Sequence, residues 1–338
     1  MRPMPRLDDP GIGRRHGRVQ GSGEALPLRV GTRGSPLALW QTRHFLAIVS
    51  GFCPVLRAAE AFDEHVISTA GDRIQDQRLA DIGGKGLFAK EIHEALVDRR
   101  VDFAVHSLKD LETELPAGIV LACLLRREDA RDAIVLGPDA NPVDVANPYG
   151  VLPHGAVVGT ASVRRQSQML HARPDLRVEM IRGNVQRRLA RVHGGEFAAS
   201  LLALAGLRRL GLEAEAAVVL DPEVMVPAAG QGIIGITVRA GDTELRELLG
   251  GIGDRGTTTA ATAERALLGA LDGSCRTPIG GYARLLPDGD LHLTGLVARP
   301  DGSFLLKRSE TGAAKDAARL GQELGDRLRR ETPTDVFA

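Results

Sequence analysis

A short pattern that occurs twice limits most strongly what this chain can fold into. An apolar stretch runs into Gly-Thr, then Ser, then a helix, first as "VGTRGSPLALWQ" (residues 30–41) and again as "VVGTASVRRQSQML" (157–170). A strand that ends in a glycine turn before a serine-capped helix is typical of α/β proteins. In the first of the two predicted helices, Leu37, Trp40, His44 and Ala47 recur at helical spacing. The repeat predicts two similar α/β lobes.

Two further segments support this interpretation, because each places a cationic turn after an apolar strand. They are "DFAVHSLKDL" (102–111) and "SLLALAGLRRLGL" (200–212). The Gly-punctuated stretch "AAGQGIIGITVR" (228–239) suits a crossing between the lobes. A chain of 338 residues is also long enough for two or three domains. We therefore expect a first lobe at 27–125 and 232–250, and a second at 126–231, facing each other across a cleft.

The last third of the chain has a different character. Helical patterns at 257–271 and 314–331 enclose three strand-like segments at 277–286, 291–299 and 303–310, and Asp-Gly turns separate the strands. This order predicts a small α+β domain over 251–338, in which helices cover a three-stranded antiparallel sheet.

Composition limits the partners of the chain. Lys+Arg and Asp+Glu both number 43 and aromatic residues are 3%, which argues against nucleic acid as a partner. No apolar run approaches the length of a membrane span. Residues 1–26 lack the apolar core of a secretory signal, and we expect them to be a disordered extension. Cys53, Cys123 and Cys275 are far apart, which favours neither disulfides nor zinc and suits the cytoplasm.

Cationic residues recur at the predicted turns of both lobes. Any one of them is explained by ordinary solvated surface charge. As a set, they favour a cleft that binds a polyanion, because the arginine fork suits carboxylates and phosphates. The set comprises Arg33, Lys85, Lys109, Arg164, Arg165, Arg182, Arg188, Arg208 and Arg209.

Asp110 stands inside this positive field, directly after Lys109. An aspartate at a strand end is commonly a turn cap, and the alternative is a general acid/base that faces a reacting centre. His93 and His106 lack partners at metal-ligand spacing, so we interpret both as structural and expect no metal.

A cysteine in a glycine-bounded turn raises a separate question. Cys275 lies in "LDGSCRTPIGGYA" (271–283) beside Arg276. Most free cysteines are small apolar fillers, whereas a reactive one needs thiolate character, which a neighbouring cation supports. The stretch alone does not decide between the two.

Taken in order, the motifs resemble the hydroxymethylbilane synthase (porphobilinogen deaminase) family from about Leu28 to beyond Ala283. They are "VGTRGSPLALWQ", "GGKGLFAKEI", "FAVHSLKDLETELP", "REDARDA", "VVGTASVRRQSQ", "LRVEMIRGNVQRRL", "LALAGLRRLGL", "PAAGQGIIGI" and "GSCRTPIGGYA". The resemblance implies two lobes like those of type II periplasmic binding proteins and a third domain that carries a cofactor cysteine. It also implies a cytoplasmic monomer that joins four porphobilinogen units and releases a linear tetrapyrrole.

The resemblance assigns roles to individual residues. Cys275 would carry a dipyrromethane cofactor through a thioether, and Asp110 would be the catalytic aspartate. Residues that match the cofactor-binding set are Lys109, Thr160, Ser162, Arg164 and Arg165. Those that match the substrate-binding set are Arg33, Ser35, Gln41, Arg182 and Arg188. Weaker cleft assignments are Lys85, Asp72, Arg209 and Gln231.

Four positions depart from the family pattern: Glu112 stands where proline is usual, Ala161 replaces a serine, Ala198 an aspartate, and Arg187 a small residue. These departures keep open a degenerate homologue that binds tetrapyrroles without polymerising them. A second alternative is a non-enzymatic solute-binding protein with the same two lobes, although that protein would need no Cys275 module. Release of ammonia from porphobilinogen separates both alternatives from the enzyme.

Overall fold

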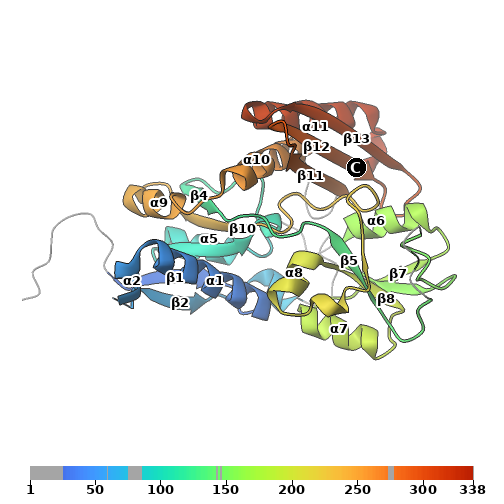
Figure 1. The fold of residues 1–338 in the computed structure, drawn as a ribbon, viewed down its shortest axis with the longest axis horizontal. Helices are drawn as coiled ribbons and strands as arrows, with labels where there is room; N and C mark the ends of the chain where they lie inside the picture. Colours follow the sequence, from blue (N-terminus) through green and yellow to red (C-terminus); the bar gives the residue numbers. More distant parts are fainter. Residues whose placement is uncertain are drawn as a thin grey trace, which may run out of the picture.

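Three β-sheets organise the chain. The structure, a computed structural model, describes residues 26–58, 60–74, 86–141, 144, 147–272 and 278–337. In Figure 1 a first lobe (blue and cyan) and a second lobe (green and yellow) lie side by side, and a third domain (red) lies above them. Residues 1–25, which carry nearly all of the predicted extension, lie outside the described residues, as do Lys85 and Cys275.

The first lobe contains a five-stranded sheet of order β2-β1-β3-β10-β4. Strand β1 pairs in parallel with β2 and β3, whereas β10 is antiparallel to both β3 and β4. The strands are β1 (Leu28–Thr32), β2 (Phe62–Val66), β3 (Phe103–Ser107), β4 (Ile119–Leu124) and β10 (Ile234–Arg239). The helices are α1 (Pro36–Phe52), α2 (Pro54–Ala58), α3 (Ala70–Arg73), α5 (Lys90–Val97), α9 (Thr243–Gly250) and the 3-10 turn η1 (Leu108–Asp110).

The second lobe repeats this arrangement in a sheet of order β7-β6-β8-β5-β9, with β5 as the antiparallel strand. The strands are β5 (Asp132–Leu136), β6 (Val157–Gly159), β7 (Arg177–Glu179), β8 (Ala199–Ala203) and β9 (Val218–Val219). The helices are α6 (Val163–Ala172), α7 (Val185–His193), α8 (Leu204–Arg209) and η2 (Glu213–Glu215). The prediction of two similar lobes is confirmed. Each antiparallel strand, β5 or β10, enters its sheet directly after the chain has crossed from the other lobe.

The repeated Gly-Thr…Ser pattern starts the first helix of each lobe as predicted. The Oγ of Ser35 accepts a hydrogen bond from the Ala38 amide (3.2 Å) at α1, and the Oγ of Ser162 accepts one from the Arg165 amide (3.4 Å) at α6. The buried face of α1 differs from the expected stripe, because His44 and Ala47 are exposed while Phe45 and Val49 are fully buried. Contact with the sheet sets this face: Phe45 packs edge-on against Phe103 of β3 at 5.9 Å between ring centroids.

The third domain confirms the predicted antiparallel sheet, in the order β11-β12-β13. Its elements are α10 (Arg255–Ala270), β11 (Ile279–Leu285), β12 (Asp290–Ala298), β13 (Leu305–Ala313), η3 (Ala314–Asp316), α11 (Ala317–Glu331) and η4 (Thr334–Val336). Leu267 of α10 and Leu324 of α11 are fully buried in its core. A side chain at Gly321 would collide with the Ala263 carbonyl, so the two helices approach closely at this glycine.

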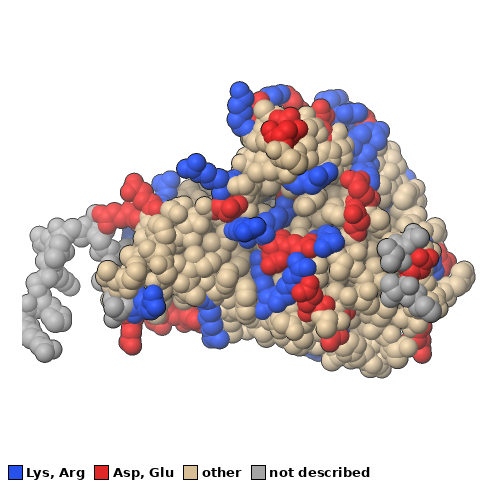
Figure 2. Space-filling view, viewed as in Figure 1, with Lys and Arg blue, Asp and Glu red and all other residues tan. Residues whose placement is uncertain are grey.

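The three parts meet at one buried carboxylate. Glu264 of α10 is fully buried and pairs with Arg127 at 2.5 Å. It also accepts hydrogen bonds from the amides of Gly230 and Ala283, both at 2.7 Å. Arg127 and Gly230 belong to the two segments that cross between the lobes. Figure 2 shows Lys, Arg, Asp and Glu side chains gathered where the parts meet. Arg208 of α8 pairs with Glu128, which follows β4 in the first crossing segment, at 3.0 Å.

No helix in the described ranges is both long enough and apolar enough to span a membrane.

Candidate active site

The turn that follows β3 sends two charged side chains in different directions. The Lys109 ammonium donates to Oε1 of Gln231, in the second crossing segment, at 3.2 Å. The Asp110 carboxylate lies 3.5 Å from the guanidinium of Arg33, which follows β1 in the same lobe. The Asp110 side chain is 28% exposed and thus open to a ligand. This turn therefore connects a site in the first lobe with residues of the crossing.

Arg33 is held between two carboxylates. It pairs with Asp72 at 2.5 Å and with Asp110 at 3.5 Å, and its guanidinium lies over the Phe88 ring at 4.2 Å. Burial would raise the pKa of Asp72, but hydrogen bonds and charge from Arg33 outweigh burial and lower it. One cation between two carboxylates leaves a local negative charge, which suits a positive charge that develops on a ligand.

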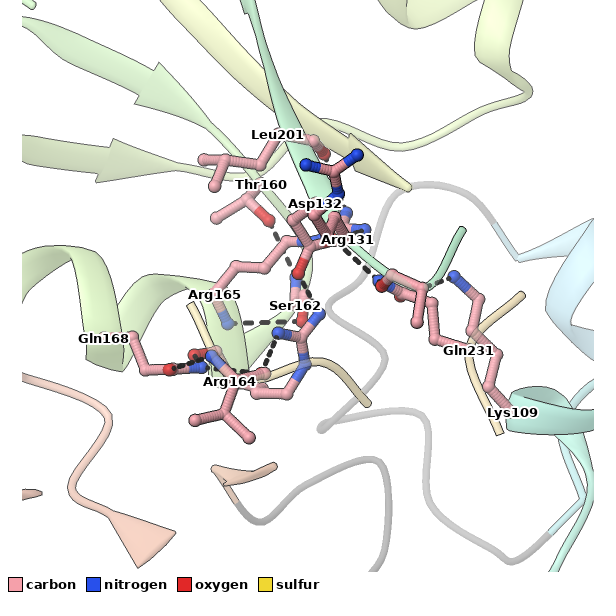
Figure 3. A network of polar contacts seen from close by, with 12 residues as sticks. Lys109, Arg131, Asp132, Thr160, Ser162, Arg164, Arg165, Gln168, Leu201 and Gln231 are labelled. Atoms are coloured by element: carbon pink, nitrogen blue, oxygen red, sulfur yellow. Dashed lines mark hydrogen bonds and ion pairs between the residues drawn. The ribbon is translucent and has the colours of Figure 1, made fainter. Parts of the chain in front are cut away.

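Asp132, at the start of β5, forms ion pairs with two arginines of the second lobe (Figure 3). It is fully buried and pairs with Arg164 and with Arg165, each at 2.8 Å. Gln231, the partner of Lys109, donates to the same carboxylate at 3.0 Å. Burial would raise the pKa of Asp132, but the charges of Arg164, Arg165 and Lys109 lower it to about 2. A carboxylate that stays ionised in this way orients both guanidinium groups.

The cations of this cluster oppose one another. Burial, and then the charge of Arg165, lower the pKa of Lys109 to about 8, although Asp110 and Asp132 act in the other direction. Burial, and then the charges of Arg165 and Arg182, lower the pKa of Arg188 to about 10. The same electrostatic field therefore includes residues from both lobes.

The balance of charge fits a ligand with several carboxylates. Lys109, Arg164, Arg165 and Arg188 outnumber the two carboxylates that act on them, Asp110 and Asp132. Arg188 donates its Nε to the Gly183 carbonyl at 2.9 Å, and its terminal amino groups bond to no other described residue. Arg164 and Arg165 are buried, and Lys109 and Arg188 are partly buried. Cations in excess that are shielded from water need anionic partners, so this donor set suits a carboxylate-rich cofactor or substrate.

Hydroxyl groups border the cluster at the start of α6. Thr160 Oγ1 accepts from the Ser162 amide at 3.1 Å, and Ser162 caps the helix through the Arg165 amide. The helix N-terminus adds a partial positive charge beside Arg164 and Arg165. Ala161, which replaces a serine of the family pattern, lies between these two residues. The two predicted hydroxyl residues, Thr160 and Ser162, both lie at the border of the cluster.

Several of the other predicted residues link structural elements. Arg182 donates to the Gly71 carbonyl of the first lobe at 3.0 Å, so it bridges the lobes. Gln41 exchanges hydrogen bonds with the Ser107 hydroxyl at 3.0 and 3.1 Å and ties α1 to the end of β3. Arg209 lies apart from these groups: it donates to the Gly232 carbonyl at 2.7 Å, and its charge acts on Glu128 and His44.

The sequence analysis missed Asp132. Its signal was present in "REDARDA" (127–133), where Asp132 precedes an apolar run. Nothing in that stretch shows that the carboxylate meets Arg164 and Arg165, because the three residues come together only when β5 and α6 pack in the second lobe.

The structure places Cys123, His93 and His106 in the interior of the first lobe. Cys123 is buried in β4, and burial raises the pKa of its thiol to about 12, so it is unreactive. The rings of His93 and His106 lie 5.7 Å apart. In the described part of the chain, no group of three or more His, Cys, Asp or Glu is placed to hold a metal ion.

Comparison with known families agrees with the geometry. Residues 28–247 match the model described as "Porphobilinogen deaminase, dipyromethane cofactor binding domain". Residues 258–330 match the model described as "Porphobilinogen deaminase, C-terminal domain". The two models together span both lobes and most of the third domain.

Individual relatives cover nearly the whole chain. The porphobilinogen deaminase of Paracoccus denitrificans (strain Pd 1222) is 46% identical over 92% of this chain and 96% of its own length. That of Sorangium cellulosum (strain So ce56) is 48% identical over 90% of this chain and 98% of its own length. Among solved structures, the substrate-binding protein of an amino acid ABC transporter has a TM-score of 0.36 at 10% identity, over 67% of this chain and 90% of that chain. With two family models and these relatives in agreement, the chain belongs to the porphobilinogen deaminase family.

Proposed function

We propose that the chain condenses four porphobilinogen units into a linear tetrapyrrole, with loss of ammonia at each condensation, at the site around Asp110. It is a transferase of tetrapyrrole biosynthesis, a hydroxymethylbilane synthase. The observation that carries the site assignment is the juxtaposition of one accessible carboxylate, Asp110, with a largely buried cluster in which cations outnumber carboxylates.

The cations match the substrate chemically. Every porphobilinogen ring carries an acetate and a propionate, so binding needs fixed positive charge on either side of the ring. Arg188 offers donors that no other described residue occupies, and Arg33 and Arg182 reach the same region from the two lobes. Each hydrogen bond between charged partners contributes about 1.5–3 kcal/mol. We propose that these arginines, with Ser35 and Gln41 beside them, hold the incoming ring.

A second set of residues suits the cofactor. A dipyrromethane group attached through Cys275 would supply the free pyrrole carbon to which the first substrate ring is joined. Lys109, Arg164 and Arg165 would bind its carboxylates, and Thr160 and Ser162 would donate their hydroxyl hydrogens. Asp132 orients the two arginines through ion pairs, and Gln231 orients Lys109 through a hydrogen bond.

Asp110 handles the charge that appears when ammonia leaves. Loss of ammonia from the protonated aminomethyl group leaves a positive charge spread over the substrate ring and its pyrrole nitrogen. The Asp110 carboxylate can accept the pyrrole N–H as a hydrogen bond and so stabilise that charge. Arg33 holds Asp110 at 3.5 Å, beyond hydrogen-bond distance, so the carboxylate oxygens remain open to the substrate.

Three further proposals complete the assignment. The domain boundaries are 27–125 with 232–250, 126–231 and 251–338, and the membership of each strand in its sheet supports them. The protein acts as a cytoplasmic monomer, in line with its widely spaced cysteines. Porphobilinogen is its partner, and nucleic acid and membranes are not, in line with its balanced charge.

Ammonia release tests the function. Purified protein supplied with porphobilinogen should release one ammonia for each porphobilinogen consumed and form a linear tetrapyrrole. A solute-binding protein, or a homologue that only holds tetrapyrroles, would bind ligand and release none.

Replacing individual arginines should separate the two roles. Arg164→Leu and Arg165→Leu should impair cofactor assembly, because each change removes one cation of the proposed cofactor-binding set and leaves Asp132 partly unpaired. Arg188→Leu should assemble the cofactor and fail at substrate addition. Intact mass gives the cofactor content, and the rate of porphobilinogen consumption gives the addition step.

Conservative variants provide the control for charge alone. Arg188→Lys should also lose activity, since a point charge does not reproduce the fork of a guanidinium. Arg187→Leu, at the exposed neighbouring position, should behave as wild type. Normal elongation by the variants at Arg164, Arg165 and Arg188 would show that the cleft is misplaced.

Assembly of the cofactor should depend on pH through Lys109. The pKa of Lys109 is about 8. Its charge is therefore present below that pH and lost as the pH rises through it. Apoprotein from a host that makes no porphobilinogen should assemble the cofactor more slowly at pH 9 than at pH 7. Lys109→Arg keeps its charge throughout, so its assembly rate should lack this decline; an equal decline in both proteins would contradict the assignment.

A further inference from the structure

A buried pair of titratable groups lies beneath the turn that carries Asp110. Glu112 follows that turn, and its Oε2 lies 4.0 Å from Nδ1 of His93 in α5. The side chains are 11% and 3% exposed. Glu112 Oε2 and both ring nitrogens of His93 are buried and have no hydrogen-bond partner among the described residues. Buried polar atoms of this kind are costly unless they satisfy each other, so the two groups need one another.

The pair sits where three elements converge. Arg265, from α10 of the third domain, donates to the carbonyls of Glu112 and Thr113 at 2.6 and 2.7 Å. Glu112 Oε1 occupies the space above Gly86, whose φ of +77° and missing side chain permit this approach. The segment directly after Asp110 is thus clamped by α5, by the Gly86 turn and by the third domain.

Two other titratable or charged groups face the pair. His106 of β3 lies beside His93 and bonds to Thr237 Oγ1 through its Nε2 at 2.9 Å. The charge of Arg265 acts on Glu112. Burial lowers the pKa of His93, and the Glu112 carboxylate acts in the opposite direction. Glu112 is therefore the group that favours the protonated form of the His93 imidazole.

We propose that Glu112 and His93 form a buried acid–imidazole pair that positions the Asp110 turn, which makes Glu112 and His93 positioning residues for the reaction. The inference rests on the proposed role of Asp110. Neither residue belongs to the proposed substrate-binding set, and no contact of either with Asp110 or Arg33 is present among the described residues. The pair gives a function to Glu112, which replaces the proline usual in the family.

The local backbone provides a sharp variant. Leu111, which precedes Glu112, has φ −87° and ψ 145°, the extended conformation that a following proline requires. The Glu112 amide donates no hydrogen bond to the described residues. The preceding residue and the free amide are thus compatible with Glu112→Pro, which removes the carboxylate, while Glu112→Gln keeps the shape and removes the charge.

The first experiment measures the interaction between Glu112 and His93 without enzyme turnover. The His93 imidazole is titrated by NMR in wild type, Glu112→Gln and Glu112→Pro, with His93→Gln to assign its signal. Both Glu112 variants should titrate His93 at a lower pH than wild type, because the carboxylate that favours the protonated ring is gone. An unchanged His93 titration in either folded variant would overturn the pair.

The second experiment measures how loss of the pair changes kcat and KM. Glu112→Gln should lower kcat about tenfold, within the range of coupling between residues in contact, with KM within about twofold. Adding His93→Gln should cause no further loss, since the pair acts as a unit. Wild-type kcat in Glu112→Gln, or losses that multiply in the double variant, would overturn the positioning role. If wild type itself released no ammonia, the proposed function would fail while the NMR titration still judged the pair.

Discussion

Asp110→Asn should keep the fold and any bound cofactor and lose turnover by at least about a hundredfold, the usual contribution of a general acid/base. The amide preserves the size of the side chain but carries no charge. It cannot stabilise the cation left when ammonia departs, and it leaves Arg33 with Asp72 as its one remaining described carboxylate partner. The measurement is the rate of ammonia release in a single turnover of holoprotein.

A nearby carboxylate provides the matched control. Glu114 is exposed on the segment that follows the same turn, and Glu114→Gln should retain wild-type turnover. Circular dichroism and intact mass establish that both variants are folded and loaded. Turnover near the wild-type rate in Asp110→Asn would remove Asp110 from the mechanism.

Cys275→Ser should lack both the cofactor and the activity. A serine hydroxyl is not ionised at neutral pH and cannot replace the thiolate as a nucleophile. Neither of the other cysteines can substitute. Cys123 is buried in β4 with its pKa raised to about 12, and Cys53 is the partly exposed residue that ends α1.

The tether explains why loss of one sulfur should have so large an effect. A growing chain held on the protein makes each condensation intramolecular on one side, which raises the effective concentration of the reacting carbon. It also keeps unfinished chains from leaving between additions. Cys53→Ala and Cys123→Ala should therefore keep full activity per folded molecule, whereas Cys275→Ser should have none. Activity in Cys275→Ser, or its loss in Cys53→Ala, would contradict this.

Local pattern predicted the framework of the fold. Ser35 and Ser162 start their helices as expected, because a cap is decided by the neighbouring residues alone. The Asp-Gly turns of the third domain likewise separate its strands. The stripe of α1 that the sequence spacing suggested is not the stripe that is buried. Contact with Phe103 of β3 decides which side of the helix is covered.

The candidate site could be predicted only in part. Lys109, Arg164, Arg165 and Asp110 were found because they stand at recognisable turns. The contacts that join them were not, because Gln231 links Lys109 to Asp132 only after the chain has crossed twice between the lobes. The approach of His93 to Glu112 is hidden for the same reason: α5 and the Asp110 turn meet through packing of the first lobe.

Intact mass spectrometry of the purified, folded protein tests the central claim most directly, because it asks whether a covalent pyrrole group is present and where. The account predicts a mass above that of the polypeptide by two pyrrole units, mapped by peptide analysis to Cys275 and absent from Cys275→Ser. An unmodified protein that is fully active, or an adduct on Cys53 or Cys123, would contradict it.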